Sequence, residues 1–242
     1  ALTAETGNLV AGLSKIGVSS DASTKAIDIF TKSLKQTPRT ALKSTKSLVK
    51  IAESLDISVG AAFQNFNALM PELAQFGASA IDVFGGLQAQ ARATGIEVGK
   101  LSKMAMSLDT FQGAAKAAQG LNAVLGGTFI SVTDLTHAKP HEKINLIRQA
   151  FERAGMTFET AHRRVKQLVA TQLGVDVGTA TRMFGSKEDY DSVTEGLDTT
   201  AASTEEMVAK MENQMTSAEL MKKSLSSLAG GMTKMVKIGR TT

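Results

Sequence analysis

The sequence has no cysteine, no tryptophan, one tyrosine and three prolines among its 242 residues. Without cysteine it can form neither a disulfide nor a cysteine-ligated metal site, and this absence fits a protein that assembles inside a cell. Aromatic residues make up only 5% of the chain, whereas hydrophobic residues make up 43%. Small and aliphatic side chains with little proline favour long helices and thin contacts between them over one dense centre.

Strong charge and long apolar runs are also missing. The formal net charge is +4, and no run of lysine and arginine is long enough to be a nucleic-acid-binding tail. The most apolar stretch, residues 73–87, is too short to span a membrane and contains Asp82. We therefore expect no stable membrane span, and no signal peptide is recognisable. Because the first residue is Ala1, we expect a processed chain or an internal piece of a longer one.

The stretch 108–127, LDTFQGAAKAAQGLNAVLGG, predicts a helix with two different faces. Asp109 and Gln112 have the spacing of a capping box, and the glycine pair 126–127 is typical of a helix end. Three- and four-residue steps define an apolar face made of Phe111, Ala114, Ala115, Ala118, Leu121 and Leu125. A second, bare face has almost no side chain and consists of Gly113, Ala117 and Gly120. We expect the apolar face to hold residues 128–185 and the bare face to receive another chain.

Periodicity and helix breakers predict an all-α protein: an extended arrangement of helices, a small compact helical module and a C-terminal coiled-coil-like helix. In the compact module, helices are expected to begin near Pro140 and after a cap at Thr157. The expected parts are a series of amphipathic helices (1–107), the compact module (108–185), a polar linker (186–203) and a heptad-patterned helix (204–242).

Local signals give further expectations within the first two parts. The Thr37-Pro38 pair is expected to separate two helices, because proline cannot continue a helix and restricts the residue before it. Asp56 or Ser58 is expected to cap the next helix, and Pro71 to lie in the first turn of the one after it. Residues 128–139 are expected to form an irregular link.

The final part carries the longest periodic pattern in the chain. Its heptad seam consists of Val208, Met211, Met215, Ala218, Lys222, Leu225, Ala229, Met232 and Val236. A single lysine in such a seam costs stability but can set the register or the number of associating helices. We expect this helix to associate with copies of itself.

Residue sets with the spacing of a catalytic or metal site are lacking. Ser47 and Lys50 fit a Ser-x-x-Lys pattern, but the companion motifs of penicillin-recognising enzymes are missing. His137 and His141 are four residues apart, yet Pro140 between them argues against a shared helical face. We therefore expect no enzyme, no metal and no cofactor.

A helix-turn-helix is the alternative interpretation of residues 167–184. Ala170 and Gly174 have the spacing of that motif, but Gly178 weakens the second helix, and the same corner also packs two short helices together. In this alternative Thr179, Thr181 and Arg182 would face a DNA groove, while Arg163, Arg164 and Lys166 would contact phosphates. Sequence-specific DNA binding stays the second interpretation, behind helix packing.

Residues 108–185 resemble a bacteriophage tail tape measure protein of the long-tailed phages. The resemblance covers about a third of the chain and is carried by LDTFQGAAKAAQGLNAVLGGTFI, a helix ending in FERAG, the segment MTFETAHRRVKQLVATQLGV, and a short helix ending in MFG. Its most specific part is residues 110–127. The sequence departs from the family where Ala161-His162-Arg163-Arg164 replaces a tyrosine-containing stretch.

The resemblance implies a structural virion protein that is assembled in the host cytoplasm and lies in the tail lumen and tail tip. Three copies, or alternatively six, would line the tube, their length setting tail length, with one end anchored in the tip or baseplate hub. The protein would leave ahead of the DNA, and transient proximity to DNA is implied. Because an α-helix rises only about 1.5 Å per residue, the chain is short for this task. We expect a C-terminal or hub-anchored part of a longer protein, with much apolar surface covered by other copies or by hub and tube proteins.

Overall fold

A computed structural model describes residues 2–185, with side chains from residue 5 onward, and all regular structure in this range is helical. This confirms the all-α fold class. The predicted linker and heptad helix lie outside the described residues. The helical elements, in chain order, are α1 (Leu2–Lys15), α2 (Ser20–Asp28), the π-helical turn η1 (Ile29–Ser33), α3 (Pro38–Ser54), α4 (Val59–Leu73), the 3₁₀ turn η2 (Ala74–Ser79), α5 (Ala80–Thr94), α6 (Val98–Ser107), α7 (Phe111–Leu125), α8 (Val132–His137), α9 (Pro140–Arg153), α10 (Arg163–Leu173) and α11 (Val177–Phe184).

Short-range signals place several helix starts as predicted. The hydroxyl of Thr37 accepts the N–H of Thr40 at 3.3 Å, and Pro38 is the first residue of α3, so the break at this pair is confirmed. Ser58 caps α4, its hydroxyl accepting the N–H of Ala61 at 3.1 Å. In each case a polar side chain satisfies an amide that has no partner inside the helix.

Three boundaries differ from the predictions. Pro71 lies inside α4 and not at the start of the next helix; in the last turn its missing N–H removes only one hydrogen bond. The chain turns instead at Gly77, whose φ of 52° is left-handed. Residues 128–139 contain the short helix α8, capped by the hydroxyl of Ser131. Thr157 begins no helix: α10 starts only at Arg163, after a turn.

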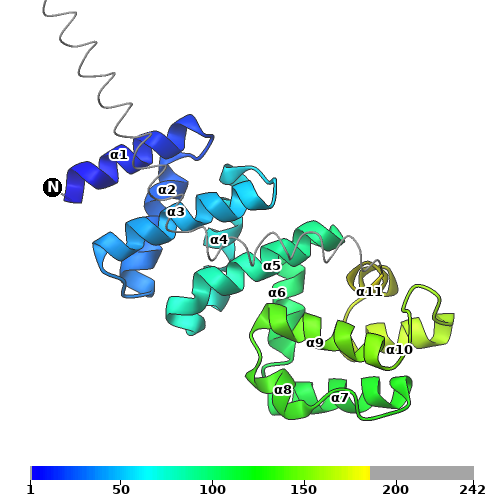
Figure 1. Cartoon of the computed structure of the whole chain (residues 1–242). Helices are drawn as coiled ribbons and strands as arrows, with labels where there is room; N and C mark the ends of the chain where they lie inside the picture. Colours follow the sequence, from blue (N-terminus) through cyan, green and yellow to red (C-terminus); the bar gives the residue numbers. More distant parts are fainter. Residues whose placement is uncertain (1, 186–242) are drawn as a thin grey trace, which may run out of the picture. The chain divides into compact units, whose positions relative to one another are not determined.

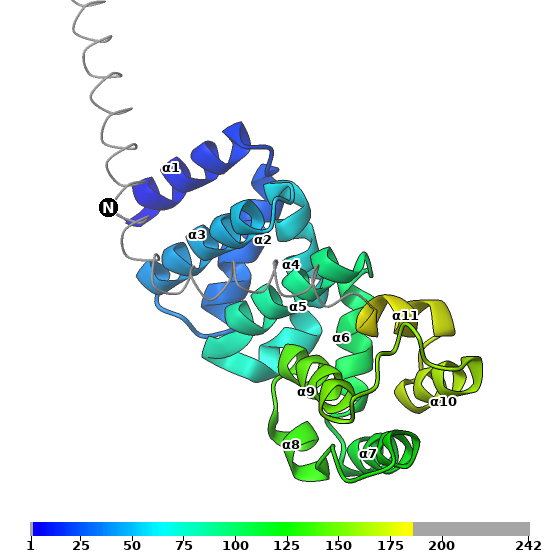
Figure 2. The same ribbon diagram turned by 45° about the vertical axis from the view of Figure 1, so that its right-hand side comes forward.

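Most helices pack on their near neighbours in the chain, and the exceptions are the contacts of α9 with α5 and α6 and of α7 with α10 (Figures 1 and 2). Helices α1 to α4 contact one another, and α5 packs on α3, α4 and α6. Helix α9 then lies on α5 and α6, which precede it by about fifty residues, while α7 packs between α8 and α10 and α11 packs on α10. Helix α9 therefore provides much of the contact between the first six helices and the last five among those described.

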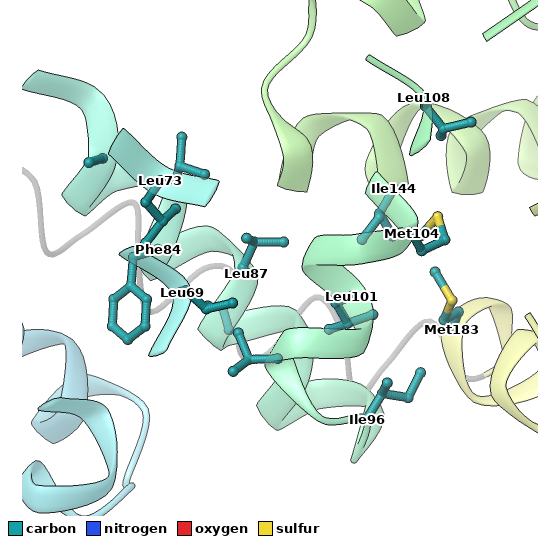
Figure 3. Close-up of a cluster of buried hydrophobic side chains, with 14 of the residues drawn as sticks. Leu69, Leu73, Phe84, Leu87, Ile96, Leu101, Met104, Leu108, Ile144 and Met183 are labelled. Atoms are coloured by element: carbon teal, nitrogen blue, oxygen red, sulfur yellow. The ribbon is translucent and has the colours of Figure 1, made fainter. Parts of the chain in front are cut away.

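A single hydrophobic cluster runs through these helices, without interruption at residues 107 and 108. Figure 3 shows part of it, with Met104 of α6, Ile144 of α9 and Met183 of α11 on neighbouring elements. The exposed large apolar side chains in the described residues are Ile16, Phe111, Leu168 and Val177. The expectation that much apolar surface is left for other chains is therefore wrong for residues 5–185, because their helices cover one another's apolar faces.

Candidate functional site

Helix α7, the stretch with the most specific resemblance, begins and ends close to the predicted positions. Its cap is Thr110, whose hydroxyl accepts the N–H of Gly113 at 3.0 Å, and not Asp109. It ends at Gly126, which has a φ of 75° and thus takes the left-handed conformation that favours glycine. Because Thr110 caps the helix, the Asp109 carboxylate is available to pair with Lys143.

The apolar face of α7 is buried along most of its length. Ala114, Ala118 and Leu121 lie in the core, and Leu125 lies at its edge with 8% of its surface exposed. Two residues of the predicted face are not buried: Ala115 is half-buried, and 75% of the surface of Phe111 is exposed. As the first residue of α7 it lies beyond the helices that cover the remainder of this face.

The bare face of α7 is occupied by the same chain, which corrects the expectation that it receives another one. Ala117 is fully buried. A Cβ atom added at Gly120 would lie 2.3 Å from the side-chain carbon Cδ of Gln172 on α10. At Gly113 it would lie 2.0 Å from the backbone oxygen of Ser107. The small residues thus let α10 and the α6–α7 turn approach α7 closely.

Asn122 on α7 fixes the loop that follows the helix, a role that its sequence position did not reveal. Its side-chain oxygen accepts the N–H groups of Phe129 (2.9 Å) and Ile130 (2.8 Å), and its amide donates to the oxygen of Ile130 (2.8 Å). One side chain therefore satisfies three backbone groups in the segment leading to α8. The glycines at positions 126 and 127, four and five residues after Asn122, are the only local signal for this arrangement.

A buried ion pair connects α9 to the start of α7. The side chain of Lys143 is 0% exposed, and its ammonium contacts the carboxylate of Asp109, which is 34% exposed. Removing a charge from water is costly unless an opposite charge and hydrogen bonds compensate for it. The pair therefore fixes α9 relative to the turn before α7.

Further polar contacts join the first turn of α9 to α5. The Lys139 ammonium lies 2.5 Å from the Asp82 carboxylate, and this hydrogen bond raises the pKa of Lys139. The amide of Gln90 on α5 donates to the backbone oxygen of His141 at 2.7 Å. Glu142 accepts the N–H of Lys139 at 2.7 Å, as in a capping box.

Three phenylalanines gather at the other end of α9. The ring centroids of Phe151, Phe158 and Phe184 are 5.5 to 5.6 Å apart in pairs. Beside them Arg148 is largely buried and donates to the backbone oxygen of Met183 at 2.5 Å. These side chains line a cavity of about 340 Å³, and the described chain ends at its edge, at Gly185. The packing of Phe158 in this cluster explains why the turn before α10 is longer than predicted.

The residues singled out for DNA binding are not presented together. Thr179 is buried, and its hydroxyl and N–H both bind the Asp176 carboxylate, which lowers the pKa of Asp176. The Thr181 hydroxyl bonds within α11, and Arg182 donates to the backbone oxygen of Gly95 at 3.3 Å. Among the predicted phosphate contacts, Arg163 and Arg164 are exposed, whereas Lys166 donates to the backbone oxygen of Glu159.

A second cavity, of about 360 Å³, lies between α6 and the turn from α10 to α11. Lys100 and Lys103 line it from α6, and Asp176 lines it at the start of α11. The negative charge of Asp176 occupies the helix terminus that would otherwise attract an anion.

No described group of three histidine, aspartate or glutamate side chains is arranged to hold a metal ion. His137 is exposed, with Nδ1 beside the oxygen of Thr133 at 2.8 Å, whereas the ring of His141 packs on Gly86 of α5. Ser47 and Lys50, which fit the Ser-x-x-Lys pattern, lie within α3. None of the helices in the described range is both long enough and apolar enough to cross a bilayer.

The predicted self-association residues Val208, Met211, Met215, Ala218, Lys222, Leu225 and Met232 lie outside the described part of the chain. Within that part the geometry is that of a packing module, in which close helix contacts and buried polar pairs fix α7 and α9. A scan against protein-family models and searches of curated proteins and of solved structures found no match.

Proposed function

We propose that this chain is part of a tail tape measure protein of a long-tailed bacteriophage, a structural protein that sets tail length. The observation that carries the proposal is the resemblance of residues 110–127, which form α7 and its caps. Three contact groups surround this helix: α8, α10 and the buried Asp109–Lys143 pair. The segment with the most specific resemblance is thus a structural element of the module.

In this proposal the two parts of the chain have different tasks. Residues 5–185 bury most of their own large apolar side chains, which fits a module that folds by itself. We assign to this module the anchoring at the tail tip or baseplate hub. The heptad helix 204–242 provides self-association, as a trimer or alternatively a hexamer, and extends along the tail lumen. The protein is released ahead of the DNA on infection.

The DNA-binding alternative receives no support from the arrangement of α10 and α11. A reading helix has to present its polar side chains to the groove. Thr179 instead points into the protein as part of the α11 cap, and Arg182 contacts Gly95.

The length relation tests the proposal directly. An in-frame duplication of residues 208–228, three heptads, should lengthen the tails by about 32 Å, at about 1.5 Å per helical residue. Tail length is measured by electron microscopy of virions carrying the duplicated gene. The matched control replaces the same residues with a shuffled heptad sequence of equal length and should leave tail length unchanged. Virions that carry the duplicated gene but have tails of unchanged length would rule out a measuring role.

A further inference from the structure

The ring of His141 lies between α9 and α5. His141 is the second residue of α9, and its ring lies directly over Gly86. A Cβ atom added at Gly86 would lie 2.3 Å from His141 Cγ and 2.5 Å from its Cδ2, so only glycine leaves room for the ring. On the same segment the backbone oxygen of His141 accepts the Gln90 amide. The residue therefore contacts α5 through both its side chain and its backbone.

The surroundings of the His141 ring favour the neutral imidazole over the protonated, positively charged one. Its Nδ1 atom is buried and has no hydrogen-bond partner. The chain has three histidines, and the other two, His137 and His162, are exposed. Burial lowers the pKa of His141 below its ordinary value of 6.5.

The charges around the ring act in both directions. The carboxylates of Asp82 on α5 and Glu142 on α9 favour a proton on the imidazole, and the ammonium of Lys139 opposes it. Asp82 is already paired with Lys139, and Glu142 with the N–H of Lys139. No described charge of α6 or α8 contributes, although both helices contact α9. The loss of hydration therefore outweighs the two carboxylates.

We propose that His141 is an acid-sensitive wedge: when its imidazole takes up a proton, the first turn of α9 detaches from α5 while the helices α1 to α4 remain packed. The detached form lets the Nδ1 atom of the charged ring reach water, whereas in the closed form this atom is buried. The wedge depends only on contacts between α5 and α9 and does not require the proposed tail function.

The direction of the pH dependence follows from the two protonation states. With the pKa lowered in the closed form, the open form binds more protons in the interval between that pKa and 6.5. The closed form is therefore fully favoured above about pH 6.5 and loses stability as the pH falls through this interval. The opening constant should rise by up to about tenfold per pH unit there.

Hydrogen–deuterium exchange of the full 242-residue chain, followed by mass spectrometry between pH 7.5 and 5, tests the wedge. Exchange at the imidazole carbon reports the titration of each histidine, and corrected amide protection factors report opening. We expect His141 to titrate below its ordinary value of 6.5, and the peptides of α5 and α9 to lose protection before those of α3. His141→Phe, which keeps a ring but cannot take a proton, should abolish the pH response. His137→Phe, an exposed ring four residues earlier, is the matched control and should preserve it.

A second variant keeps the test decisive if His141→Phe fails to fold. Gly86→Ala should displace the ring toward water, bring the titration of His141 up toward 6.5 and reduce the pH response of α5 and α9. Three outcomes would overturn the proposal: titration of His141 at or above 6.5, loss of protection in α3 over the same pH interval, or a persisting pH response in His141→Phe.

Discussion

Asp109 lies one residue before the cap of α7, and its carboxylate is the partner of the fully buried Lys143 ammonium. We expect Asp109→Asn to lower the free energy of unfolding by about 2 kcal/mol. Breaking a fully buried pair costs more, but the Asp109 side chain is partly exposed. Urea unfolding followed by circular dichroism measures the loss.

Two further variants check that the loss comes from burial of the unpaired lysine. Asp28→Asn removes the exposed partner of Lys32 and should cost less than about 0.5 kcal/mol. Adding Lys143→Met to Asp109→Asn should recover most of the stability, because no charge is then buried. A double variant as unstable as Asp109→Asn would contradict the ion-pair explanation.

Gly113 and Gly12 are both helical glycines but have opposite surroundings. A Cβ atom at Gly113 would meet the backbone oxygen of Ser107, which cannot move aside easily, whereas one at Gly12 would meet nothing within 4 Å. We expect Gly113→Ala to destabilise the protein by about 2 kcal/mol, typical of overpacking. Gly12→Ala should stabilise it by up to about 1 kcal/mol, since alanine favours helix. Thermal unfolding should show a lower melting temperature for Gly113→Ala and a higher one for Gly12→Ala. Equal changes in melting temperature would refute the close contact at Gly113.

At the residue level the sequence predicts short-range interactions better than long-range ones. Ser58 could be identified as a cap because it bonds three residues along the chain. The sequence did not predict the contact of Asp109 with Lys143 or that of His141 with Gly86, because each pair is separated by tens of residues. Many other polar side chains at helix ends could have been chosen as partners. Asn122 precedes the glycines at 126 and 127, but this spacing does not specify which backbone groups its side chain binds.

Among the elements, the contact of α7 with α10 depends on Gly120. We expect Gly120→Leu to lower the free energy of unfolding by about 2 kcal/mol, because the larger side chain overlaps Gln172 of α10. Chemical denaturation measures this. Gly120→Ala should change stability by less than about 1 kcal/mol, since the flexible Gln172 side chain can move aside.

Shortening the neighbour tests the same contact from the other side. Adding Gln172→Ala to Gly120→Leu should restore part of the stability lost in Gly120→Leu. Sedimentation should show the same oligomeric state for the unmodified chain, Gly120→Leu and the double variant. A change of oligomeric state without loss of stability would mean that this face meets another chain.

Periodicity predicted which helices exist better than which neighbours they meet. The apolar stripe of α7 was visible in the sequence, and most of it is buried. The bare face gave no sign of whether its partner was α10 or another copy, because small residues permit both. Helix α8 escaped notice because six residues are too few for a periodic pattern, although Ser131 and Asp134 have the spacing of a capped start.

For the whole molecule, self-association is predicted to depend on the heptad helix and not on residues 2–185. The described helices leave few large apolar side chains exposed. The double variant Leu225→Asp, Met232→Asp places two charges in the seam and should convert the chain into monomers. Analytical ultracentrifugation measures the oligomeric state, and circular dichroism should show that most helix is retained.

The control for that variant changes one exposed apolar residue outside the heptad pattern, Phe111 of α7. Phe111→Asp removes the most exposed aromatic side chain of the described helices and should leave the oligomeric state unchanged. If Phe111→Asp produced monomers and the seam variant did not, the contact between copies would belong to α7.

The position of α9 has a consequence for the order in which the chain can fold during synthesis. Helices α1 to α6 find their contacts among themselves, so they can pack as soon as they leave the ribosome. The face of α5 that carries Gly86 and Gln90 must wait for residues 140–153. In a nascent chain stalled near residue 130, this face of α5 would therefore stay exposed to solvent and accessible to chaperones. Helix α9 can cover this face only after residues 140–153 have also left the ribosome.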